Sequence, residues 1–111
     1  MRQLTSQGHP SAIFQRAIAR GNLLVAETVA RELGRLDLAD ALELTALIAQ
    51  KDTTRHSRAA ARWLRRWLEQ NVDATIHDAA LVTASLLALG GRHHGEALAT
   101  LRAAAGASPV R

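Results

Sequence analysis

Hydrophobic residues recur at intervals of three and four along most of this chain, which is the spacing of a helix with one apolar face. Three such stripes are expected to face a core: Ile13, Phe14, Ala17 and Ile18; Leu42, Leu44, Ala46, Leu47 and Ile48; and Leu81, Ala84, Leu87 and Ala88. No stretch alternates polar and apolar residues with the period of two that marks a strand. The pattern therefore predicts an all-α fold.

Residues that start or stop helices divide the chain into short segments. Pro10 suits a first helical turn and Gly21 suits a left-handed stop. Asn22 and Asp37 are typical caps, and Thr75 begins a capping box that Asp78 completes. The expected helices cover residues 10–20, 23–33, 38–50, 53–70, 76–89 and 93–105.

Connections of a few residues make consecutive helices antiparallel neighbours. About six helices in three antiparallel helical hairpins follow, arranged as a compact bundle or as a short solenoid-like stack. We expect a single helical domain over residues 1–111, with frayed termini at 1–9 and 107–111. A chain of 111 residues is long enough to bury a core of its own.

Two resemblances agree with this prediction. AIARGNLLVAETVAREL (residues 17–33) and LLALGGRHHGEALATLRAA (residues 86–104) each run helix, glycine turn, helix. This pattern resembles tetratricopeptide-type helical hairpins. Residues 21–69, with GNLLVAETVARELGRLDLADALEL followed by RAAARWLRRWLEQ, are similar to small Ala/Arg-rich all-helical proteins of actinobacteria. The resemblances imply a helical, bacterial protein and imply no activity.

The residue types that enzymes use for covalent chemistry are scarce in this sequence. There is no cysteine, which excludes thiol catalysis and zinc–thiolate sites. Gly90 and Gly91 are not followed by the Lys-Ser/Thr pair of a phosphate loop. Ser57 and Ser85 lie inside predicted helices, where neither forms a nucleophile elbow. We therefore expect no enzymatic activity and no cofactor.

The apolar segments are too short to indicate a membrane protein. Residues 1–17 lack the continuous apolar run of a secretory signal. The longest weakly polar run, residues 79–89, is about half the length that a membrane span requires. These features favour a cytoplasmic protein without membrane contact.

The concentrated charge lies on the fourth predicted helix. Five arginines fall within about a third of its circumference, at roughly 100° per residue: Arg55, Arg58, Arg62, Arg65 and Arg66. A face of this kind is most often simply solvated, but it can also clamp an acidic protein surface or contact successive phosphates. Trp63 and Trp67 border it; they could stack on unpaired bases, although such residues more often pack in a core.

The histidines form the remaining candidate cluster. His93, His94 and Glu96 stand close together, and His77 lies on the neighbouring predicted helix. Adjacent residues diverge by about 100° on a helix, so the two neighbouring histidines cannot point at one metal ion. Neither an HExxH nor an ExxH spacing is present. We expect no metal site.

These observations predict a non-enzymatic helical-hairpin module that binds another protein, with the five arginines as candidate contact residues. The alternative is a nucleic-acid-binding protein that uses the same basic face. A third reading is self-association into a homo-oligomer through an apolar helix face. The first two readings require the arginines to be exposed together rather than paired with nearby acids, for which the candidates are Asp37, Asp40, Glu43 and Glu69.

Overall fold

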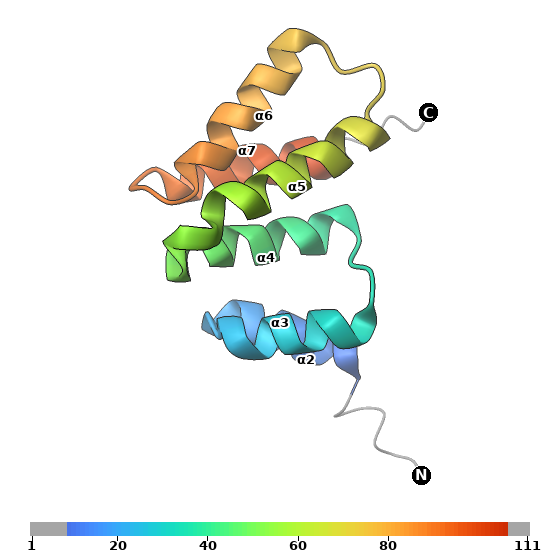
Figure 1. Ribbon diagram of the computed structural model, residues 1–111, viewed down its shortest axis with the longest axis vertical. Helices are drawn as coiled ribbons and strands as arrows, with labels where there is room; N and C mark the ends of the chain where they lie inside the picture. Colours follow the sequence, from blue (N-terminus) through green and yellow to red (C-terminus); the bar gives the residue numbers. More distant parts are fainter. Residues whose placement is uncertain (1–8, 107–111) are drawn as a thin grey trace.

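The computed structural model describes residues 9–106, which form three antiparallel helical hairpins (Figure 1). The hairpins consist of α2 (Pro10–Arg20) with α3 (Leu23–Leu33), α4 (Leu38–Lys51) with α5 (His56–Gln70), and α6 (Ile76–Ala88) with α7 (His94–Gly106). No strand occurs within residues 9–106. The predicted all-α fold is therefore confirmed.

The expected capping residues set most helix boundaries. Gly21 ends α2 with φ +70°, a conformation that glycine adopts without the steric cost other residues pay. The Asn22 and Asp37 side chains cap α3 and α4, and Thr75 forms the predicted capping box with Asp78. His9, which lies within the range expected to fray, caps α2 by accepting a hydrogen bond from the Ser11 N–H. The other residues expected to fray lie outside the described part of the chain.

The start of the fourth helix differs from the prediction. A 3₁₀ turn, η1 (Thr53–Arg55), precedes α5, which begins at His56 rather than near Thr53. The Asp52 carboxylate accepts hydrogen bonds from the Thr54 hydroxyl and from the Arg55 guanidinium. The α-helix begins only after this turn, and its N-cap residue, Arg55, supplies no side-chain cap.

Two hydrophobic clusters hold the hairpins together. The larger one joins α4, α5, α6 and α7 through buried residues that include Leu42, Trp63 and Leu86. The smaller one centres on Phe14 of α2, which is fully buried against α3 and against the face of α4 that carries Leu44. In Figure 1, α4 accordingly lies between the α2–α3 hairpin and the group formed by α5, α6 and α7.

The predicted apolar stripe of α6 was wrong for three of its four residues, and the fourth, Ala88, packs against the larger cluster. Leu81 and Leu87 are 53% and 63% exposed, and Ala84 is exposed as well. The residues that α6 and its C-terminal end bury are Val82, Ser85, Leu86 and Leu89. This helix is apolar on nearly every side, so spacing alone could not reveal which side would pack against α5 and α7.

Within residues 9–106, none of the helices combines the length and the apolar character that crossing a membrane demands.

Candidate interaction groove

Arg55 is already engaged within the protein. Its guanidinium donates two hydrogen bonds to the Glu27 carboxylate, at 2.7 and 2.9 Å, and its Nε donates to Asp52 at 2.7 Å. These bonds lower the pKa of both acids and raise the pKa of Arg55. Arg55 therefore ties η1 to α3 and has little capacity left for an external partner.

Arg66 is half-buried and partly engaged. One of its Nη groups donates to the Leu36 carbonyl at 2.8 Å, while its buried Nε–H has no partner. Such an unmet buried donor costs free energy, and more so when it is charged. Arg66 is therefore partly committed to the loop before α4, and its buried Nε–H is out of reach of a docking partner.

Three of the predicted arginines remain on the surface of α5. The side chains of Arg58 and Arg62 make no hydrogen bond or ion pair with residues 9–106. Arg65 lies 3.6 Å from Glu69, an exposed pair one helical turn apart that contributes little. The structure therefore keeps part of the predicted basic face available and commits Arg55 to an internal bridge.

Both tryptophans lie in the core, which is the more common location for such residues. Trp63 is 2% exposed and donates from its indole N–H to the Leu38 carbonyl; Trp67 is 5% exposed and donates to the Ala104 carbonyl. Neither ring face is free for a base to stack on. Contact of this surface with nucleic acid would have to rely on arginine–phosphate pairs.

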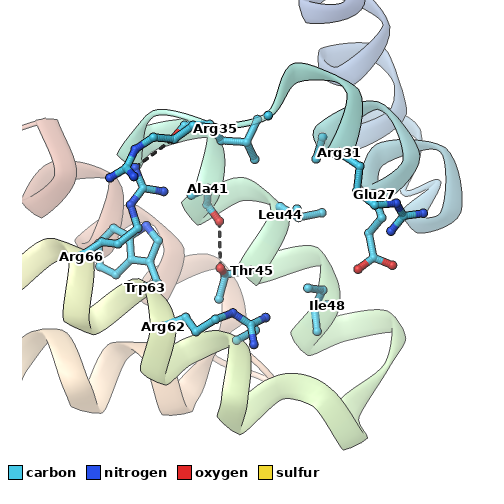
Figure 2. A pocket seen from close by; sticks show the side chains of 14 residues that line it. Glu27, Arg31, Arg35, Ala41, Leu44, Thr45, Ile48, Arg62, Trp63 and Arg66 are labelled. Carbon is cyan, nitrogen blue, oxygen red and sulfur yellow. Dashed lines mark hydrogen bonds between the residues drawn. The ribbon is translucent and has the colours of Figure 1, made fainter.

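A groove lies over α4, between α3 on one side and α5 on the other (Figure 2). Its volume is about 380 Å³, near the lower end for binding sites, and it is open to solvent. Its apolar floor comes from Ala30, Leu36, Ala41, Leu44, Ile48, Ala59 and Trp63. The buried Thr45 hydroxyl at the floor donates to the Ala41 carbonyl, so it is satisfied internally.

Arginines from both walls surround this floor. Arg31 and Arg35 come from α3 and the loop after it, and Arg62 and Arg66 come from α5 (Figure 2). Among residues 9–106, the single acid that lines the groove is Glu27, which Arg55 neutralises. The groove therefore combines an apolar floor with a positive rim.

Three contacts hold the walls in place. The Arg55–Glu27 bridge joins η1 to α3, and Arg66 of α5 bonds to the Leu36 carbonyl in the loop between α3 and α4. Gln15 of α2 donates to Asp40 of α4 at 2.8 Å. Because these bonds link separate hairpins, the groove exists only while the α2–α3 hairpin stays docked.

The acids expected to neutralise the basic face have other roles. Asp37 caps α4, Asp40 accepts from Gln15, and Glu43 forms a two-bond bridge to Arg102 at 2.7 and 2.9 Å. The bridge to Glu43 raises the pKa of Arg102. Within residues 9–106, Glu69 is the one expected acid that forms an ion pair with an arginine of the basic face.

Sequence reasoning missed Arg31 and Arg35 as site residues. They stand about 30 positions before Arg62 in the chain, so no local spacing connects them to it. Only the packing of both α3 and α5 against α4 brings the two pairs to one groove.

The histidines have separate surroundings. His93 lies 3.2 Å from Glu96, and the His94 ring contacts the Leu89 carbonyl at 2.6 Å. His77 stands at the first turn of α6, whereas His94 follows the opposite end of that helix. Among residues 9–106, no group of three or more His, Asp or Glu side chains is placed to hold a metal ion.

Comparisons with protein-family models, with curated proteins and with solved structures find no match to this chain.

Proposed function

We propose that this protein is a non-enzymatic interaction module whose groove between α3 and α5 binds an acidic segment of a partner protein. The observation that carries the proposal is the set of four arginines around an apolar floor, with the lining acid already neutralised. Apolar anchors of a partner would fill the floor, and its carboxylates would pair with the rim.

The spacing of the rim favours a helical partner. Arg62 and Arg66 stand four residues apart on α5, which is about 6 Å along the helix axis. Carboxylates one turn apart on a docking helix have the same spacing. An amphipathic helix with acidic flanks would therefore place leucine-like residues on the floor and acids on the rim.

Photo-cross-linking tests this proposal in the cells that make the protein. A photoreactive residue at Ala41, in the groove floor, should give a discrete heavier product that the same residue at exposed Ala80 does not give. The captured segment should be acidic. No product specific to Ala41 would contradict the proposal.

Charge reversal supplies a control with the same change in net charge. Arg31→Glu/Arg62→Glu reverses two groove arginines, whereas Arg58→Glu/Arg65→Glu changes the net charge equally at positions that do not line the groove. We expect only the groove variant to lose the cross-linked product. Equal loss in both variants would show that general charge attraction, not the groove, selects the partner.

The same variants test the second candidate, nucleic-acid binding. This candidate retains the support of Arg58 and Arg62, which are exposed and unpaired within residues 9–106. Phosphate contact by that face predicts salt-dependent binding of mixed DNA or RNA, lost in Arg58→Glu/Arg65→Glu. Absence of binding at low salt would remove the candidate.

A further inference from the structure

The connection between α5 and α6 exposes apolar side chains beside acids. Val72 is 82% exposed and Ile76 is 89% exposed; Asp73 follows Val72 directly, and Asp78 lies two residues after Ile76. We refer to residues 71–78 as the acidic tip. Hydrogen bonds to the Thr75 backbone and side chain lower the pKa of Asp78, so this carboxylate is ionised at neutral pH.

The acidic tip and the groove are complementary in chemistry. The tip offers two aliphatic side chains and two carboxylates, whereas the groove offers an apolar floor and four arginines. None of the tip residues lines the groove of its own chain. Resting on the proposed function of the groove, we propose that the tip of one copy docks in the groove of a second copy.

Charge argues against the simpler arrangement in which two tips face each other. Asp73, Asp78 and the nearby Glu69 would then meet their own counterparts, and like charges brought together repel. Opposite charges meet only when the tip contacts the arginine rim. The favoured contact is therefore between two different surfaces.

A contact between two different surfaces leaves one tip unfilled at one end of a dimer and one groove unfilled at the other end. Association consequently continues to longer chains unless it closes into a ring. The tip presents only two large apolar side chains, so the contact is small and belongs to the weak, transient class. It should be detectable at roughly 0.1–1 mM protein and should weaken in high salt, because the Debye length shortens.

Sedimentation equilibrium of the full chain tests the proposal. At low salt, the weight-average mass should rise with concentration above the 11.9 kDa of one chain, and at 0.5 M salt it should return toward that value. A wild-type protein that remains monomeric at about 1 mM in low salt would overturn the inference.

Two complementary variants make the test specific. The tip variant is Val72→Ser/Ile76→Ser, at exposed positions where serine leaves the core intact, and the groove variant is Arg31→Glu/Arg62→Glu. Each alone should be monomeric, because it lacks one half of the contact. When the two variants are mixed, the intact tip of the groove variant can enter the intact groove of the tip variant. The mixture should therefore form a dimer and nothing larger.

The outcomes separate this inference from the proposed function. A mixture that stays monomeric, or a tip variant that associates like the wild type, refutes docking of the tip. Capture of a different protein by the cross-linker at Ala41 would still support the proposed function in that case. Circular dichroism melting of both variants shows whether each is folded before its association is measured.

Discussion

Replacing Phe14 by alanine should undock the α2–α3 hairpin and remove one wall of the groove. Phe14 is fully buried in the smaller hydrophobic cluster, which is separate from the cluster shared by α4 to α7. A buried Phe→Ala change costs about 3–5 kcal/mol, from lost apolar burial and the cavity that remains. That is a large part of the roughly 5–15 kcal/mol that stabilises a domain.

Hydrogen exchange measures where this free energy is lost. Protection of the α2 and α3 amides should fall by about two to nearly four orders of magnitude in Phe14→Ala, since 1.4 kcal/mol corresponds to a factor of ten. The melting temperature should fall by roughly 12–20 °C. Photo-cross-linking from the groove should disappear with the α3 wall.

A substitution in the other cluster is the control. Leu86→Ala, also at a buried position, should cost about 2–5 kcal/mol and reduce protection in α6 and α7 while leaving the local opening of α2 and α3 unchanged. The reasoning is refuted if Phe14→Ala costs less than about 1 kcal/mol, or if both substitutions reduce protection equally in both clusters.

Further predictions concern caps, glycines and pH. Removing the capping hydroxyl in Thr75→Ala should lower the free energy of unfolding by about 1 kcal/mol in denaturant titrations. Gly21→Ala places alanine in a left-handed backbone conformation and should lower the free energy of unfolding by about 1–2 kcal/mol. Gly95→Ala, in open space within α7, should raise it by about 0.5–1 kcal/mol. Equal effects of the two substitutions would contradict this reasoning. The Arg55 bridge holds the pKa of Glu27 below its usual 4.5. The stability that the ionised Glu27 contributes is therefore complete above pH 4.5 and is lost as the pH falls through the lowered pKa. In melting experiments from pH 6 to pH 2, Glu27→Gln should lose less stability on acidification than the wild type does.

The helix boundaries could be predicted because they depend on local chemistry. Asn22, Asp37 and the Thr75–Asp78 pair each bond to backbone groups within three residues, so their roles are readable from sequence alone. The hairpin pairing followed from the short connections between consecutive helices. The resemblances to tetratricopeptide-type hairpins and to actinobacterial proteins stay predictions.

The site could be predicted only in part, because it depends on tertiary packing. Helical periodicity identified the basic face of α5, but it could not show that Arg55 would bridge to Glu27 on another hairpin. It also could not place Arg31 and Arg62 on the two walls of one groove, since their helices meet only through α4. The wrong stripe on α6 has a related cause: where a helix is apolar on several sides, its neighbours decide which side is buried.

An NMR titration tests the central claim most directly. The ligand is a synthetic helical peptide with leucines along one face and glutamates on both flanks, compared with the same peptide carrying lysines. We predict shift changes at the groove-floor amides of Ala41, Leu44 and Ile48 with the acidic peptide alone, reduced by Arg31→Glu/Arg62→Glu. Equal binding of the lysine peptide, or shift changes confined to other surfaces, would contradict the account.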